Sequence, residues 1–250
     1  MIELKGITVG YGGTSVLREV SATIEKGKLT SIIGVNGCGK STLLKATLGM
    51  LPLTDGEILI DGRNIETMQG REIARRIAYL SQGKVTPDMT VGQLVLHGRF
   101  PYLSYPRRYG AKDREIAREA MASVGILELA DKPLSALSGG MRQTAYIAMA
   151  LAQDTDYILL DEPTTYLDIT HQIELMRLLR RLCEAGRGVV TVMHDLPVAF
   201  DFSDKIIAVR GDCGALQAPP REMCDTSLIE ETFRVKIERH TDGGYHYKYT

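Results

Sequence analysis

The segment that decides the fold of this chain reads Gly34-Val35-Asn36-Gly37-Cys38-Gly39-Lys40-Ser41. It fits the pattern G-x-x-x-x-G-K-[ST], in which glycines let successive N–H groups point at phosphate oxygens. The apolar run 29–33 predicts a buried strand before the loop, and the apolar pattern up to Gly49 predicts a helix after it. This context predicts a nucleotide site, with Lys40 on the β- and γ-phosphates and Ser41 on Mg²⁺, rather than a chance glycine turn.

A second segment carries two adjacent carboxylates. The apolar run 157–160 is typical of a strand buried on both faces of a parallel sheet, and it ends in Asp161 and Glu162. Open α/β sheets place their ligands at this end of the strands. We therefore expect Asp161 to hold Mg²⁺ through water and Glu162 to act as general base toward an attacking water. A solvated helix start before Pro163 is the alternative, and the phosphate loop disfavours it.

A third segment, Leu137-Ser138-Gly139-Gly140, completes a set that resembles the ATP-binding subunit of ABC transporters. The segment is similar to that family's signature, which other phosphate-loop classes lack. The resemblance runs without a large gap from about Ile2 to about Met223. Further matches follow in the family's order: the adenine-stacking aromatic (Tyr11), the glutamine loop (Gln82), the loop after the second strand (Thr165-Tyr166-Leu167-Asp168) and the switch histidine (His194).

The resemblance implies ATP and Mg²⁺ as cofactors and assigns residues to them. Two copies are expected to bind head to tail, each ATP lying between the phosphate loop of one copy and the signature of the other. The implied nucleotide contacts are Tyr11, Asn36, Gly37, Cys38, Gly39, Lys40, Ser41, Thr42, Ser138, Gly139, Gly140 and Asp168. The implied Mg²⁺ ligands are Ser41, Gln82 and Asp161, and the implied catalytic residues are Glu162, His194 and Gln82.

Three segments narrow the resemblance. The segments 36–40, 98–102 and 168–172 are similar to those of subunits that power iron–siderophore, haem and vitamin B12 importers. The implied partners are polytopic permease subunits and, indirectly, an external substrate-binding protein, which would hold the chain on the cytoplasmic face of the inner (plasma) membrane. A soluble ABC-type ATPase acting in cofactor assembly, translation or repair is the alternative. Met141 and Thr144 depart from the usual signature helix, and the sequence does not name the cargo.

Composition limits the remaining classes. The chain has 250 residues, 44% hydrophobic residues and a net charge of −1, so it has no bulk attraction to nucleic acid. It has no apolar run near the ~18 residues of a membrane span, and its first residues predict an edge strand rather than a signal peptide. Cys38, Cys183, Cys213 and Cys224 form no metal-binding pair and are expected to be reduced thiols.

The organisation along the chain predicts a single α/β domain, with core 1–86 and 146–250 and a helical, signature-bearing insertion 87–145. The core is expected to be a phosphate-loop ATPase core with a mostly parallel sheet and an N-terminal antiparallel portion. Helices are expected at 91–97 and 114–124, and strands at 157–160, 189–193, 206–209 and, after a turn at 54–56, at 57–60.

Three surface stretches remain to be placed. The resemblance implies a groove that receives a short helix of the permease, and we expect this groove to include residues soon after Gln82 and the loop 100–105. The apolar residues 100–103 support such an interface, because soluble proteins rarely expose such patches. The basic and aromatic segment 102–109 predicts an exposed loop rather than a nucleic-acid site. His240 and His246 predict a terminal strand with residues 243–249 rather than a metal site.

Overall fold

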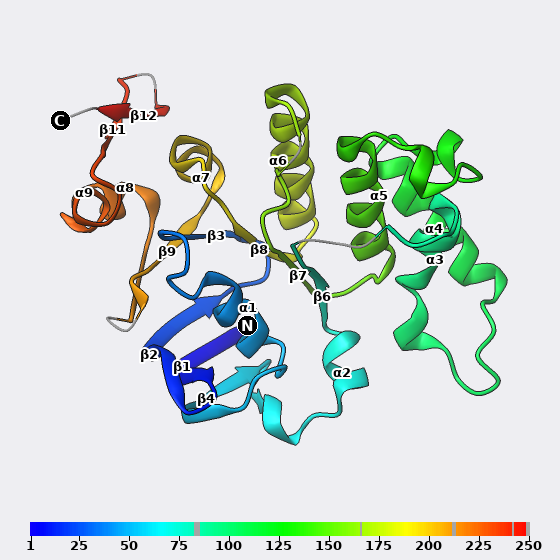
Figure 1. Ribbon diagram of the computed structural model, residues 1–250, viewed down its shortest axis with the longest axis horizontal. Coiled ribbons are helices and arrows are strands. Elements are labelled where there is room, and N and C mark those ends of the chain that lie inside the picture. Colours follow the sequence, from blue (N-terminus) through cyan, green and yellow to red (C-terminus); the bar gives the residue numbers. More distant parts are fainter. Residues whose placement is uncertain (83–85, 166, 212–213, 242, 249–250) are drawn as a thin grey trace.

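The computed structural model describes residues 1–82, 86–165, 167–211, 214–241 and 243–248. Residues 83–85, which follow Gln82, and Tyr166, Cys213 and Tyr249 belong to segments considered above and lie outside the described residues. No helix in the described part of the chain is long and apolar enough to cross a membrane. The described chain forms two large sheets and a small C-terminal hairpin (Figure 1).

The central sheet has the order β10-β9-β3-β8-β7-β6, and it is parallel except for β10, which runs antiparallel to β9. Its strands are β3 (Leu29–Ile33), β6 (Ile77–Leu80), β7 (Tyr157–Leu160), β8 (Gly188–Val192), β9 (Lys205–Val209) and β10 (Ala215–Ala218). An antiparallel sheet of order β2-β1-β4-β5 contains β1 (Ile2–Tyr11), β2 (Thr14–Ile24), β4 (Leu53–Ile60) and β5 (Arg63–Asn64). The C-terminal hairpin pairs β11 (Lys236–Arg239) with β12 (Tyr245–Lys248).

The α-helices of the described chain are α1 (Lys40–Thr47), α2 (Gly70–Ala74), α3 (Val91–His97), α4 (Ala111–Ser123), α5 (Gly139–Ala152), α6 (Ile169–Glu184), α7 (Leu196–Phe202), α8 (Pro220–Cys224) and α9 (Leu228–Phe233). The helices α5, α6 and α7 pack against the central sheet, α3 and α4 lie beyond α5, and α8 and α9 lie near the C-terminal hairpin (Figure 1). Short 3-10 helices are η1 (Ile65–Thr67), η2 (Phe100–Tyr102), η3 (Leu127–Leu129) and η4 (Leu134–Ala136). The described residues of the insertion 87–145 contain no strand, whereas α5 runs across its predicted end at 145. The division into core and insertion stays a prediction.

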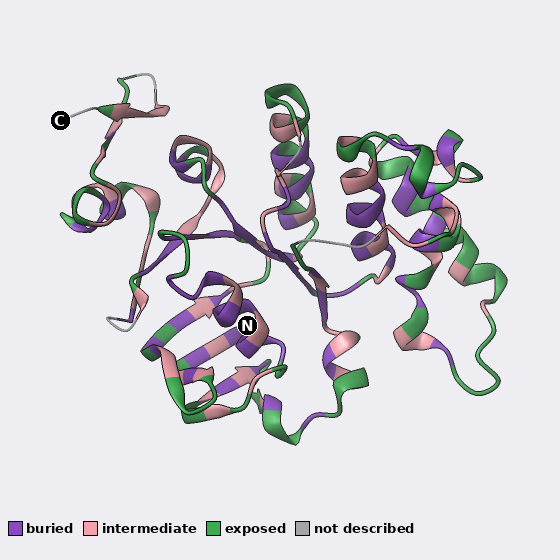
Figure 2. Cartoon of the chain, in the orientation of Figure 1, coloured by how far each residue is buried: buried purple, intermediate pink, exposed green. Residues whose placement is uncertain are grey.

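The central sheet separates two hydrophobic clusters, because side chains alternate along each strand. In β7, Tyr157 and Leu159 join the cluster that contains α1 and the antiparallel sheet, whereas Ile158 and Leu160 join the cluster under α5 and α6. All four side chains are buried, which confirms the strand predicted to be buried on both faces. Figure 2 shows this burial along the central strands, with exposed residues on the outer faces of the helices.

Two expectations about the N-terminal strands are wrong. β1 is not an edge strand, since it pairs with β2 on one side and with β4 on the other. The predicted turn 54–56 lies inside β4, which keeps pairing with β1 across a register shift between Lys5 and Thr8. Alternation of apolar residues identifies a strand but not its neighbours, and a bulge absorbs the residues that look like a turn.

The close approach of α3 to α5 depends on Gly98. A Cβ at this position would lie 2.3 Å from the Met149 carbonyl oxygen and 3.0 Å from the Gln153 nitrogen. The Gly98 backbone has φ −54°, which any residue adopts, so Gly98→Ala should act through this clash alone. We expect it to lower the free energy of unfolding by about 1–3 kcal/mol. Thermal denaturation measures the effect.

The matched control is Gly70→Ala at the start of α2, where a Cβ would meet no atom within 4 Å. This control should leave the melting temperature close to that of the wild type. Equal melting temperatures for Gly98→Ala and Gly70→Ala would contradict a tight contact between α3 and α5.

Candidate functional site

The phosphate loop lies between β3 and α1, as the sequence predicts. Gly39 caps α1 with φ +105°, and a Cβ there would lie 2.8 Å from Leu17 Cδ2, so glycine meets both requirements. The Lys40 side chain folds back over the loop and donates to the carbonyl oxygens of Gly34 at 2.8 Å and Val35 at 2.9 Å. The loop thus holds its one ammonium group against its own backbone.

A cavity of about 540 Å³ opens over this loop. It brings together the predicted nucleotide and catalytic residues from five separate segments of the chain. Its lining residues are Tyr11, Val16, Asn36, Gly37, Gly39, Lys40, Ser41, Thr42, Gln82, Glu162 and His194. Cys38 does not line the cavity: its side chain is buried beneath the loop, and burial raises the pKa of its thiol.

Three predicted catalytic side chains meet at one carboxylate. Gln82 Nε2 donates to Glu162 Oε2 at 2.5 Å, and His194 Nε2 lies 2.6 Å from Glu162 Oε1. Glu162 has φ +51°, a region that non-glycine residues rarely adopt and that is common at functional sites. The sequence pattern predicts the three residues but neither this strained backbone nor the direct contact between Gln82 and Glu162.

Asp161 lies beneath this group and is only 3% exposed. Tyr79 Oη donates to its Oδ2 at 3.4 Å, whereas Oδ1 has no hydrogen-bond partner among the described residues. Burial raises the pKa of the Asp161 carboxyl, and the nearby Ser41 hydroxyl opposes this shift. A buried carboxylate oxygen without a partner beside a serine hydroxyl suits a hard cation with oxygen ligands.

The signature lies outside the cavity of its own chain. Ser138 is exposed and caps α5, where its Oγ accepts a hydrogen bond from the Met141 N–H at 3.3 Å. Gly139 and Gly140 follow in the first turn of α5, and none of the three lines the cavity. Asp168 is likewise exposed and caps α6 by accepting from the His171 N–H at 2.9 Å.

The expectation that residues 100–103 form an exposed apolar loop is wrong in part. Phe100 is 48% exposed, but Leu103 is only 8% exposed and packs within the fold. Arg71 donates to the carbonyl oxygens of Pro101 and Leu103, so the backbone of this segment is tied to α2. A run of apolar residues does not predict which of its side chains are buried, because the short helix η2 sets the direction of each side chain.

Sequence reasoning missed the structural role of Arg99, although the residue lies in the segment 98–102 that narrowed the resemblance. Its side chain is buried, forms an ion pair with Asp113 at 3.2 Å and donates to the carbonyl oxygen of Ala152 at 3.0 Å. Its guanidinium also lies 4.0 Å from the centre of the Tyr102 ring. Arg99 therefore ties η2, α4 and the end of α5 together, and Tyr102 is not available to stack on a base.

The C-terminal histidines lie side by side on the hairpin. The His240 and His246 rings stack with centroids 3.9 Å apart, and residues 245–248 form the predicted terminal strand. The described residues contain no group of three or more histidine, cysteine or acidic side chains placed to hold a metal ion.

The fold and the cavity define a phosphate-loop nucleotide-binding cassette, and comparison with known proteins specifies the family. Residues 17–165 match the family model described as ABC transporter. The chain belongs to the ABC transporter family, as one of its ATP-binding, ATP-hydrolysing subunits. This confirms the resemblance inferred from the sequence.

Individual relatives cover nearly the whole chain. It is 46% identical to the petrobactin import ATP-binding protein FpuD of Bacillus anthracis, over 96% of this chain and 89% of that protein. It is 42% identical to the ferric enterobactin transport ATP-binding protein FepC of Escherichia coli, over 92% and 86%. The dimeric structure of a bacterial ABC transporter cassette superposes with a TM-score of 0.76 at 30% identity, over 88% of this chain and 99% of that one.

Proposed function

We propose that this chain is the ATP-hydrolysing subunit of a membrane importer for an iron–siderophore or a related metal chelate. The observation that carries the hydrolytic part is the meeting of Gln82, Glu162 and His194 above the phosphate loop. The cargo class is supported by relatives named as petrobactin import and ferric enterobactin transport subunits. The alternative of a soluble ATPase in cofactor assembly, translation or repair has no support from these relatives.

ATP would occupy the cavity of about 540 Å³, with Tyr11 stacked on adenine and the amides of residues 36–42 on the phosphates. Lys40 would exchange its two carbonyl partners for the β- and γ-phosphates. Ser41 and Gln82 would hold Mg²⁺, and Asp161 would hold it through water. The partnerless Asp161 Oδ1 fits this assignment, and the bound ion would offset negative charge on the phosphates.

Hydrolysis would need a water activated by Glu162. His194 and Gln82 contact the Glu162 carboxylate in the described structure. Both would turn toward the γ-phosphate and the water when ATP is bound. Glu162 would then take a proton from the water as it attacks phosphorus. His194 would orient the water and contact the γ-phosphate, and the leaving group would depart as ADP.

The exposed position of the signature supports a two-chain site. Ser138, Gly139 and Gly140 lie at the free N-terminus of α5, outside their own nucleotide cavity. We propose that they close over the γ-phosphate bound to a second copy, with Asp168 near the same junction. Closure and reopening of this head-to-tail dimer would drive permease subunits that hold the chain on the cytoplasmic face of the membrane.

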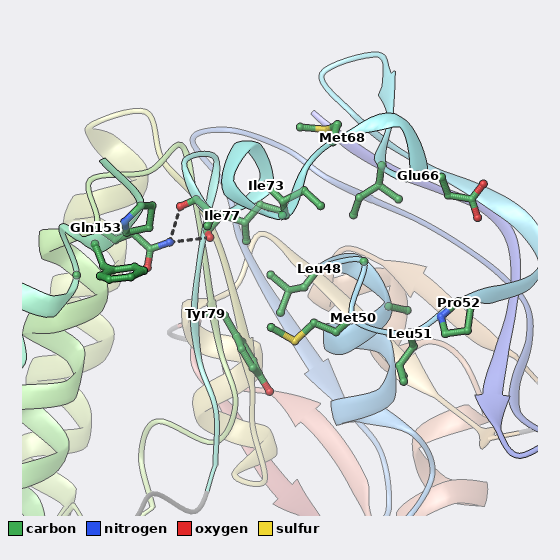
Figure 3. Close-up of a pocket in the computed structure, with 18 of the residues that line it drawn as sticks. Leu48, Met50, Leu51, Pro52, Glu66, Met68, Ile73, Ile77, Tyr79 and Gln153 are labelled. Atoms are coloured by element: carbon green, nitrogen blue, oxygen red, sulfur yellow. Dashed lines mark hydrogen bonds between the residues drawn. The ribbon is translucent and has the colours of Figure 1, made fainter. Parts of the chain in front are cut away.

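A second cavity supplies a groove for the permease. It measures about 940 Å³ and is lined by residues from α1, η1, α2 and β6 together with the segment around η2 (Figure 3). Leu48, Met50, Ile73 and Tyr79 supply much of its apolar wall (Figure 3), and Phe100 also lines it. The groove thus joins both parts of the chain, and Tyr79 in its wall donates to Asp161 at 3.4 Å, so a change at the nucleotide would reach a short permease helix bound there.

A pair of substitutions separates docking from folding at this groove. Phe100→Glu should leave the melting temperature and basal ATP hydrolysis unchanged, because the ring is 48% exposed, but it should weaken co-purification with the permease. Leu103→Glu places a charge at a site only 8% exposed and should lower the free energy of unfolding by several kcal/mol, about 2 or more. Full recovery of the permease with Phe100→Glu would contradict docking in this groove.

A further inference from the structure

The C-terminal hairpin contacts the helix that follows the switch histidine. β12 packs against α7, and Figure 1 shows the hairpin at the end of the chain beyond α8 and α9. Tyr247 Oη accepts a hydrogen bond from the Leu196 N–H at 3.2 Å, and the Tyr245 N–H donates to Asp201 Oδ1 at 2.9 Å. The Tyr245 ring meets Phe200 edge-on with ring centroids 5.4 Å apart. The hairpin therefore contacts α7 near both of its ends.

Tyr247 completes the cap of α7. The first N–H groups of any helix lack partners within the helix. In α7 the first is that of Leu196, the second residue is Pro197, which has no N–H, and Asp195 Oδ1 accepts from Val198 at 3.2 Å. The Tyr247 hydroxyl accepts the hydrogen bond of the Leu196 N–H, which Asp195 leaves without a partner. A group more than fifty residues away in the sequence thus finishes the cap that Asp195 begins.

This cap lies two residues from His194. On the other side of His194, the Met193 N–H donates to the Ile32 carbonyl oxygen at 3.1 Å, which ties the end of β8 to the sheet. The backbone of His194 is therefore held on one side by the hydrogen bond of Met193 to the sheet and on the other side by the N-terminus of α7. Its own ring contact is the 2.6 Å approach of Nε2 to Glu162 Oε1. The position of the ring depends on where α7 begins.

We propose that the C-terminal hairpin positions the switch histidine, with Tyr247 as the positioning residue. The proposal rests on the role proposed above for His194 in hydrolysis. Tyr247 does not line the nucleotide cavity, so losing its hydroxyl should disturb the step that uses His194 and leave ATP binding unchanged. The expected signature is a fall in kcat with an unchanged KM for ATP.

The test compares two tyrosine-to-phenylalanine variants of the full chain. Tyr247→Phe keeps the ring and removes the acceptor of the Leu196 N–H, and loss of that hydrogen bond predicts a fall in kcat of about threefold to tenfold. Tyr245→Phe is the matched control, because its hydroxyl makes no hydrogen bond within the described part of the chain while its ring stays against Phe200. The Leu196 amide should exchange with solvent faster in Tyr247→Phe only.

A double-mutant cycle with His194→Ala decides whether the effect passes through the histidine. If it does, Tyr247→Phe should lower kcat in the wild-type background and have no further effect in His194→Ala. An unchanged kcat for Tyr247→Phe, a raised KM, or the same fold-loss in both backgrounds would overturn the proposal. If His194→Ala itself hydrolyses ATP at the wild-type rate, the proposed role of His194 fails as well, so the two failures are distinguishable.

Discussion

Replacing Glu162 by glutamine should lower the turnover of ATP by about 10²-fold or more, because an amide cannot take a proton from the attacking water. ATP affinity should stay close to that of the wild type. The amide keeps the shape of the carboxylate, and its oxygen can still accept a hydrogen bond from His194, which lies 2.6 Å from Glu162 in the described structure. Phosphate release measures turnover, and isothermal titration measures binding.

The matched control is Glu119→Gln on the exposed face of α4, which removes the same charge far from the cavity. It should leave both turnover and binding unchanged. Turnover by Glu162→Gln above about a tenth of the wild-type rate would contradict the role of general base.

Replacing Lys40 by alanine should weaken ATP binding by about 10²-fold, since the loop would lose the one ammonium group that can reach the terminal phosphates. The substitution would also destabilise the loop itself, because the Gly34 and Val35 carbonyl oxygens would lose the hydrogen bonds that Lys40 donates to them. The loop would then be less ordered before ATP arrives. Isothermal titration with Mg-ATP measures the loss.

Lys45→Ala is the matched control, because Lys45 lies in the last turn of the same helix and outside the cavity. It removes the same charge and should bind ATP normally. Near wild-type affinity in Lys40→Ala would contradict the assignment of Lys40, whereas equal losses in both variants would show only a general charge effect.

The elements nearest the phosphate loop could be predicted closely from sequence. β3, β7 and β8 are apolar runs in a sheet buried on both faces, and α3 begins with the capping pair Thr90 and Gln93. Errors arise where pairing or side-chain direction depends on distant parts of the chain. The neighbours of β1 and the inward turn of Leu103 are set by tertiary packing, which local periodicity does not encode.

In the candidate site, too, the residues could be predicted but their contacts could not. The residues of the cavity follow from motifs, but Gln82 and Glu162 lie 80 residues apart, and only the fold places their side chains in contact. The buried contacts of Arg99 and the cap supplied by Tyr247 are not announced by the sequence: the segment around Arg99 resembles a group of importers without indicating those contacts, and Tyr247 belongs to no motif. Such contacts join elements whose relative position is fixed by the core, so a single sequence carries no local signal for them.

If each ATP is held between two copies, the mass of Glu162→Gln, measured by light scattering, tests this arrangement most directly. With Mg-ATP the mass should double, since ATP is bound and not hydrolysed. Adding Ser138→Asp should prevent the doubling without loss of ATP affinity: aspartate still caps α5, but its charge repels the γ-phosphate of the other copy. Ser135→Asp on the nearby η4 should dimerise normally. A dimer that survives Ser138→Asp would contradict the account.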